Sequence, residues 1–244
     1  MRMTTERTQA SDERQQALYE LADRQAGYFT ASQARTAGYS DRLQHHHHQR
    51  GHWLEHGWGL YRLRDYPITD EEELTRLSLW SRTKNGELQA VISHETALEL
   101  YELTDLMPNR KHLSVPKSFR KKPPIGVILH KANLKPNDWT WRGSYRITTP
   151  LRTLIDVAAA HISPEHLEVA LEQVLERGLV RKKNLEAVIA TMPEQSPLVR
   201  SFRAVCNELE QRATATRNAE SRDAVTRDTA TQTAATRNAD TGRP

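Results

Sequence analysis

"YFTASQARTAGYSDRLQHHHHQRGHWLEHGWGLYRL", residues 28–63, contains the local signals on which the fold prediction rests. Thr30 and Gln33 have the spacing of a capping box, which begins a short helix, and Gly38 ends that helix. Ser40 then caps a further helix, which contains four consecutive histidines. We therefore expect two short helices separated by a turn at the start of this stretch.

A β-hairpin is expected directly after the histidines. The segments 52–56 and 60–64 are rich in aromatic and branched residues and flank a Gly-Trp-Gly turn. A longer helix is expected upstream, from a cap at Ser11 to about Gln25. Three helices and a hairpin are the element order of a winged helix-turn-helix domain, expected over residues 10–66. In such domains the third helix enters the major groove of DNA, and the hairpin, or wing, lies along the backbone or the minor groove.

A second domain of helices and strands is expected over residues 70–211. The expected fold class is α+β, with the winged helix-turn-helix domain followed by a mixed α/β domain. Residues 213–244 contain few large apolar side chains and cannot offset the entropy of ordering, so we expect a low-complexity disordered tail. Strands are expected at 88–92, 112–116, 126–132 and 139–148, and helices at 74–80, 93–103, 150–161, 163–178, 182–191 and 197–211.

Composition narrows the class of protein. The chain has 244 residues, of which 37% are hydrophobic, and a formal net charge of +4. Its single cysteine, Cys206, excludes an intramolecular disulfide and a cysteine-based zinc site, which favours the reducing cytoplasm. No apolar run approaches the roughly 20 residues that a membrane helix needs, and no signal peptide is recognised. A cytoplasmic protein without a membrane partner is expected.

Charge is distributed unevenly between two neighbouring segments. Residues 106–152 contain eleven Lys and Arg against one Asp, whereas residues 70–105 contain nine acids against three bases. The two segments pair with each other within one domain, or the basic segment forms a face for phosphate or for an acidic partner. The sequence leaves both interpretations open.

The four histidines admit three interpretations. His45 and His48 have the spacing to share a metal ion, but two ligands do not complete a tetrahedral site, so neither a metal nor a cofactor is expected. A purification tag is usually terminal and longer than this run. The third interpretation is an outward face of a recognition helix. Because histidine has a reference pKa of about 6.5, DNA affinity that depends on this face is expected to rise on acidification.

Candidate DNA-binding residues follow from side-chain chemistry. Gln pairs with the edge of adenine, and Arg pairs with guanine or with phosphate. The alternative is a solvated helix face in a protein-binding module, with Trp58 packed onto the core. The expected contacts are Arg42, Gln44, His45, His48 and Gln49 in the groove, Arg50 on phosphate, His56 and Trp58 on the wing, and Lys117, Arg120, Lys121 and Lys122 on an extended phosphate track.

The stretch quoted first, with "ISHETALELYEL" (92–103) and "ITTPLRTLIDVAA" (147–159), resembles the AbiEi family over about residues 17–190. Members are antitoxins of type IV toxin–antitoxin systems, which act in abortive phage infection, and related transcriptional regulators. The resemblance implies a winged helix that binds operator DNA and a C-terminal domain needed for antitoxin action. It also implies a nucleotidyltransferase toxin that is opposed without a stable protein complex. The run at 45–48 and the tail depart from the family pattern.

Catalysis is not expected. Some proteins with a similar N-terminal module continue into a nuclease core, but the residues after Ala160 predict helices instead of its metal-binding strands. Asp156 with Glu165 or Glu168 is better explained as ordinary helix surface. No phosphate-binding glycine loop, Gly-x-Ser-x-Gly or His-Glu-x-x-His motif occurs. The sequence thus favours a DNA-binding regulator, with a protein-interaction module and then a nuclease as alternatives.

Overall fold

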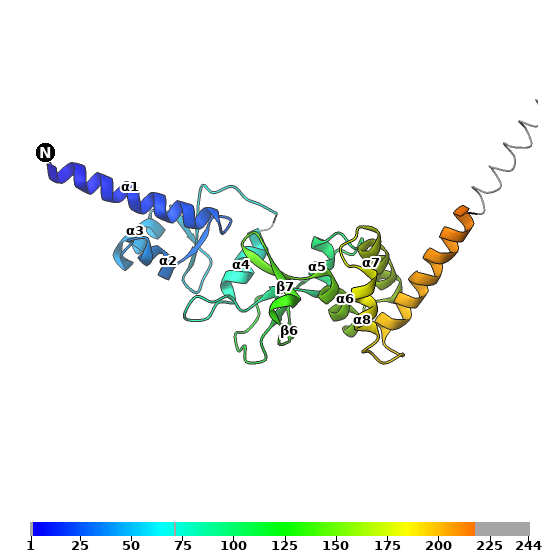
Figure 1. Ribbon diagram of the computed structural model, residues 1–244. Helices are drawn as coiled ribbons and strands as arrows, with labels where there is room; N and C mark the ends of the chain where they lie inside the picture. The colour runs from blue at the N-terminus through cyan, green and yellow to red at the C-terminus, as the bar shows by residue number, and fades with distance from the viewer. Residues whose placement is uncertain (1, 71, 218–244) are drawn as a thin grey trace, which may run out of the picture. The chain divides into compact units, whose positions relative to one another are not determined.

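The computed structural model describes residues 2–70 and 72–217 (Figure 1). The fold is α+β, and the chain divides into two units, Met1–Ala160 and His161–Pro244. The first unit begins with the element order of a winged helix and continues into a mixed sheet. These first elements are α1 (Arg2–Asp23), β1 (Tyr28–Thr30), α2 (Ala31–Thr36), α3 (Asp41–Gln49), β2 (Trp53–Glu55) and β3 (Leu60–Leu63).

Local signals set these N-terminal elements. Thr30 Oγ1 accepts a hydrogen bond from the backbone N–H of Gln33, and Gln33 Oε1 accepts one from Thr30, so the expected capping box forms. Ser40 caps α3, as expected, by accepting from the N–H of Leu43. Helix α1 begins at Arg2 rather than Ser11, since no glycine or proline interrupts this part of the chain.

The strands form an antiparallel sheet in the order β1-β3-β2. The hairpin is as expected, but β1 is an additional strand that the sequence analysis missed, because three residues are too few to show a period. A small aromatic core lies between this sheet and the helices. The ring of Trp53 lies 4.7 Å from that of Phe29 and 5.0 Å from that of Tyr39, against Leu18 and Ala22 of α1.

The rest of the first unit is built on a five-stranded mixed sheet, in the order β6-β5-β4-β8-β7. One apolar face of this sheet packs on α4, where Leu77 and Trp80 meet Ile92, Leu113 and Ile147. Helices α5 and α6 follow β4 and β8. The elements are α4 (Glu72–Trp80), β4 (Val91–Ile92), α5 (His94–Leu100), β5 (Lys111–Val115), β6 (Val127–Lys131), η1 (Pro136–Asp138), β7 (Trp139–Arg142), β8 (Tyr145–Thr148) and α6 (Pro150–Ala159).

One expectation for this sheet needs correction. Residues 139–148 form two antiparallel strands rather than one, because Gly143 adopts a φ of +55° and turns the chain. Ser93 precedes α5 but makes no capping hydrogen bond. Its hydroxyl instead accepts a hydrogen bond from Ser114 on β5, at 2.8 Å.

The first unit extends past residues 66–70 to Ala160. Tyr28 of β1 donates a hydrogen bond to Glu72 of α4 at 2.7 Å, and Arg62 of β3 forms a buried ion pair with the same carboxylate at 3.2 Å. Tyr28 and Leu60 also share a core cluster with Leu79. These contacts join the winged helix to the first helix of the following segment.

The second unit is helical within the described residues. It contains α7 (Pro164–Glu176), which is capped by Ser163, α8 (Lys182–Ile189), and a helix over 197–217. Residues 213–217 therefore continue a helix, although the sequence analysis assigns them to the tail. The remainder of the predicted tail, 218–244, lies outside the described residues. Within the described part of the chain, no helix has the length and apolar character needed to cross a membrane.

Gly27, in the turn between α1 and β1, offers a test of the packing. At its φ of +84°, a Cβ would lie 2.5 Å from the ring of Tyr66, whereas Gly57, at φ +80°, has open space around it. Gly57→Ala should cost about 1 kcal/mol for the backbone conformation alone. Gly27→Ala should cost more than twice as much in the free energy of unfolding, measured in urea. Equal losses for both variants would contradict the packing of Tyr66 over Gly27.

Candidate nucleic-acid interface

Helix α3 presents one polar face outward. Arg42, His45, His46 and Gln49, at the i, i+3, i+4 and i+7 positions, are all exposed. Arg50, the C-cap residue, is also exposed. Arginine, histidine and glutamine are the donor-rich types that contact phosphates and base edges. Four of the expected contacts, Arg42, His45, Gln49 and Arg50, are therefore available to an external partner.

Gln44 does not belong to this face. Its side chain is only 4% exposed, and its amide nitrogen donates hydrogen bonds to the backbone oxygens of Ala31, at 3.1 Å, and Tyr39, at 3.0 Å. Both acceptors lie in the helix-turn-helix segment, so Gln44 ties α3 to the start of α2 and to the turn. The expectation that Gln44 contacts a base is wrong, because its polar atoms already have buried partners.

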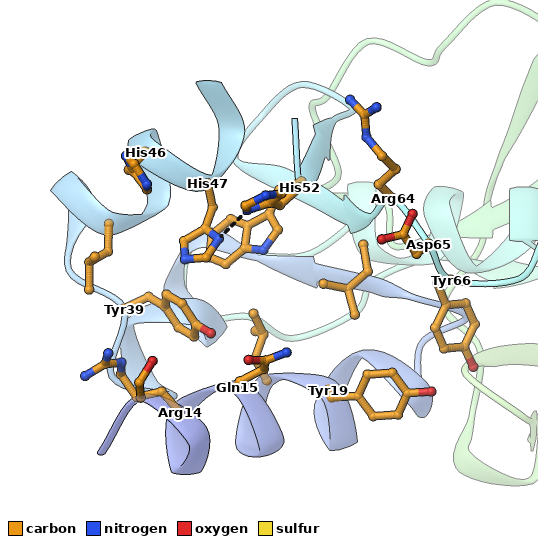
Figure 2. Close-up of a pocket in the computed structure, with 15 residues that line it drawn as sticks. Arg14, Gln15, Tyr19, Tyr39, His46, His47, His52, Arg64, Asp65 and Tyr66 are labelled. Carbon is orange, nitrogen blue, oxygen red and sulfur yellow. Dashed lines mark hydrogen bonds between the residues drawn. The ribbon is translucent and has the colours of Figure 1, made fainter. Parts of the chain in front are cut away.

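His47 and His48 also turn toward the domain. The ring of His47 stacks on Trp53 at 4.9 Å and 14°, and its Nδ1 lies 3.2 Å from Nδ1 of His52, as Figure 2 shows. Burial lowers the pKa of His47, and the neighbouring His52, His46 and Arg14 lower it further. His47 is thus a neutral packing residue at pH 7.

His48 lies against β2 instead of projecting freely. Its Nδ1 is 3.4 Å from the carbonyl oxygen of Trp53, and its Nε2 is 3.6 Å from the carboxylate of Glu55. The side chain is 39% exposed. His48 therefore lies at the edge of the α3 face, and the four histidines divide into an exposed pair, His45 and His46, and a packed pair.

The wing carries one exposed aromatic side chain. Trp58 is 64% exposed at the hairpin turn, with a φ of +52°. Its ring centroid lies 6.5 Å from that of Trp80, and its carbonyl oxygen accepts a 2.7 Å hydrogen bond from Arg82. Trp58 thus combines a contact with α4 with a solvent-facing surface. An exposed tryptophan held in place is a candidate contact residue.

His56 is not on the outer surface of the wing. Its ring packs edge-on against Tyr28 at 5.1 Å. Burial lowers its pKa, the charges of Arg76 and Arg62 lower it further, and the charge of Glu72 opposes them. His56 is half-buried and its ring contacts Tyr28, so it is not carried forward as a DNA contact.

The basic loop after β5, residues 117–122, folds next to the wing. Lys121 donates hydrogen bonds to the carbonyl oxygens of Trp80 and Arg82, both at 2.7 Å, and Arg82 in turn holds Trp58. Arg120 donates to the carbonyl oxygen of Lys117 at 2.9 Å. Lys117 and Lys122 are exposed, and neither ammonium group pairs with a described residue. The loop places these two free charges near the wing.

A histidine cluster between α5 and the sheet escaped the sequence analysis. His94 and His130 stack at 3.5 Å between ring centroids, and Nε2 of His130 lies 3.1 Å from Nδ1 of His112. His94 begins α5, whereas His130 and His112 lie in β6 and β5. No local spacing in the sequence therefore predicts the cluster. His94 has a backbone φ of +53°, which residues other than glycine rarely adopt.

The cluster is held in its neutral form. Burial, followed by the charges of His130, His112 and Arg152, lowers the pKa of His94 to about 3. Burial and His112 lower that of His130 to about 4. Within residues 2–70 and 72–217, no group of three or more His, Cys, Asp or Glu is arranged to hold a metal ion.

Helix α6 carries an ion-pair network close to this cluster. Arg152 contacts Asp156 at 2.9 Å and Asp138 at 3.1 Å, and its positive charge lowers the pKa of His94. Burial raises the pKa of Asp156, although Arg152 opposes the rise. The stretches 92–103 and 147–159 therefore lie side by side, because their helices α5 and α6 pack against each other.

Fold and surface together define a winged-helix protein with an α+β domain following it. Residues 89–209 match the family model of the AbiEi antitoxin C-terminal domain. This part of the chain is an AbiEi antitoxin domain, which supports a role as the antitoxin of a toxin–antitoxin pair. The domain spans parts of both units.

No curated protein sequence matches the chain. Among solved structures, the crystal structure of the RV2827C protein from Mycobacterium tuberculosis is similar, with a TM-score of 0.47 and 16% sequence identity over 75% of each chain.

The two glutamines of α3 form a matched pair for a stability test. Gln44→Ala leaves two buried carbonyl oxygens without their donor and should lower the free energy of unfolding by about 2 kcal/mol. Gln49→Ala removes an exposed side chain and should change it by less than about 0.5 kcal/mol. Urea unfolding measures both. A neutral Gln44→Ala would show that α3 is rotated differently about its axis.

The histidine cluster predicts a pH dependence of stability. Because His94 and His130 have lowered pKa values when folded, the unfolded chain binds more protons below about pH 6.5, and stability is lost as the pH falls. The slope for each histidine stays below the limit of about 1.4 kcal/mol per pH unit, because His130 is only partly buried and solvent screens its charge, and for His130 it ends at about pH 4.

Urea unfolding across this pH range, for the natural chain and for His130→Gln, isolates the effect from that of the carboxylates. His130→Gln should have a shallower dependence on pH. His45→Gln, at an exposed position on α3, serves as the control and should retain the original slope. Identical slopes for all three proteins would contradict the assignment.

Proposed function

We propose that the chain is a DNA-binding antitoxin that represses its own operon. Helix α3 enters the major groove of the operator, where Arg42, His45 and Gln49 contact base edges and Arg50 contacts phosphate. The wing lies along the backbone with Trp58 at its tip. Lys117 and Lys122 extend the phosphate contacts, while Arg120 and Lys121 shape the loop that carries them.

The exposed face of α3 carries this proposal. Arg42, His45 and Gln49, at the i, i+3 and i+7 positions, are exposed and are of the types that contact base edges and phosphates. The withdrawal of Gln44 into buried hydrogen bonds leaves a single continuous outward face. Arg42 and Arg50 supply fixed charge near its two ends.

The antitoxin role rests on the AbiEi domain over residues 89–209. We propose that the opposed toxin is a nucleotidyltransferase and that no stable complex forms between the two proteins. Repression of a shared operon then links the amount of toxin to the amount of antitoxin. The reducing compartment favoured by the single cysteine fits an action on chromosomal DNA in the cytoplasm.

A protein-interaction module is the competing function. One observation favours it: the wing is held to α4 by the hydrogen bond from Arg82, so Trp58 has a fixed position that also suits a protein partner. The two functions differ in their response to salt. DNA binding releases counterions and weakens steeply as salt rises, whereas docking of a neutral protein surface does not.

Two groups of variants separate base contacts from phosphate contacts. Fluorescence anisotropy should compare the protein's own upstream duplex with a scrambled duplex at several salt concentrations. The double variant Arg42→Ala, Gln49→Ala should lose the preference for the upstream duplex, at about 1–3 kcal/mol per base-edge contact. The double variant Lys117→Ala, Lys122→Ala should weaken both duplexes alike and reduce the salt slope by about 2.

Gln44→Ala is excluded from this comparison because its effect is on folding. Arg24→Gln, an exposed change after α1, is the control and should match the natural chain. Equal losses on both duplexes for both double variants would contradict the division between base and phosphate contacts. Absence of duplex binding at low salt would favour the protein-interaction module.

A further inference from the structure

A cavity of about 640 Å³ lies between α1 and the inner side of α3 (Figure 2). Volumes of this size accommodate small organic molecules. Its walls come from α1, from α3 and from the strands β2 and β3, so every side of it belongs to the winged helix. Arg42, His45 and Gln49 are not part of the lining, whereas His46, which is also exposed on α3, is.

The lining combines aromatic and aliphatic walls with basic groups. Leu18, Leu43 and Leu63 form apolar wall, and Tyr39 and Trp53 add aromatic rings. Basic groups are supplied by Arg14, Arg64 and three histidines, and the acidic group by Asp65 alone. An apolar pocket with an excess of positive charge suits a flat organic anion.

Arg14 is the group best placed to bind the anion. Its Cζ lies 5.9 Å from the centre of the Tyr39 ring, and its Nε is buried without a hydrogen-bond partner among the described residues. A buried donor without an acceptor is costly, and an arginine pairs well with a carboxylate. Figure 2 shows Arg14 beside Tyr39, whose ring lies 5.3 Å from that of His47.

Glycines make room for the two arginines of the lining. A Cβ on Gly38, after α2, would lie 2.8 Å from Cγ and Cδ of Arg14, and a Cβ on Gly51, after α3, would collide with the guanidinium of Arg64. Both glycines have positive φ, which also suits the turns that follow their helices. The turns of the helix-turn-helix thus accommodate the basic side chains at the cavity.

The cavity is in direct contact with the recognition helix. His46 and His47 line it, while their neighbour His45 lies on the outward face. His47 is stacked on Trp53 and close to His52, so a molecule in the cavity touches the contacts that set the position of α3. A ligand that favours one position of α3 changes the affinity of α3 for DNA by the same factor as DNA changes the affinity for the ligand.

We propose that this cavity binds a small aromatic carboxylate, with the carboxylate on Arg14 and the ring among the tyrosines and His47, and that the bound molecule alters DNA affinity. The second part rests on the proposed function, and the first does not. The cavity is therefore an effector site of the winged helix.

Binding to the free protein is measured by calorimetry with benzoate, salicylate and cinnamate and with their neutral amides. At least one carboxylate should bind at least tenfold more tightly than its amide. Arg14→Gln should remove this difference, and Arg24→Gln, outside the lining, should retain it. Gln15→Trp, at an exposed position on the cavity wall, should block binding without removing a charge.

Thermal unfolding establishes which variants are folded, and the comparison of acid with amide on the natural chain needs no variant. Absence of binding by every carboxylate at millimolar concentration, or equal binding of acids and amides, would overturn the site. Adding the bound carboxylate to the duplex-binding assay should shift the affinity at least threefold. Unchanged duplex affinity overturns the effector role alone, and absent duplex binding without ligand overturns the proposed function.

Discussion

The packing around Trp53 is the constraint on which the winged helix depends. Its indole is 3% exposed and contacts Phe29 from β1, Tyr39 from the turn and His47 from α3. A single ring from the hairpin thus fixes the turn and the recognition helix relative to the sheet. Burial of a tryptophan and its aromatic neighbours contributes several kcal/mol, enough to hold a small domain of short elements.

The rotation of α3 about its axis follows from this packing. Because His47 stacks on Trp53, Gln44 points inward and donates hydrogen bonds to the carbonyl oxygens of Ala31 and Tyr39. Arg42, His45 and Gln49 are then necessarily outside. The packing of the core thus determines which residues of α3 form the polar face proposed to contact DNA. A substitution in the core can therefore change the orientation of that face without altering its residues.

Local signals predicted most of the elements. The capping box of Thr30, the cap at Ser40 and the turn around Trp58 depend on neighbouring residues, and each occurs where expected. The roles of Gln44 and His56 could not be predicted, since both point toward partners that only the tertiary fold brings close. The histidine cluster on α5, β5 and β6 is non-local in the same sense. Helix spacing alone did not distinguish a buried glutamine from an exposed one.

The charge asymmetry between residues 70–105 and 106–152 is partly internal and partly external. Lys111 pairs with Glu99 at 3.1 Å, so the two segments do meet in one domain. Lys117 and Lys122 have no such partner among the described residues and lie in the loop that Lys121 fastens to α4. Ion pairs between the two segments therefore lie within the domain, and the unpaired charges of Lys117 and Lys122 are available to a polyanion.

The central claim is that the outward face of α3 and the wing form the DNA-contacting surface. Amide hydrogen exchange of the full chain, with and without its own upstream duplex, tests this claim most directly. The account predicts added protection in α3 and in β2–β3, with little change in α7 and α8. Duplex binding that protects the second unit and leaves α3 unchanged would contradict it.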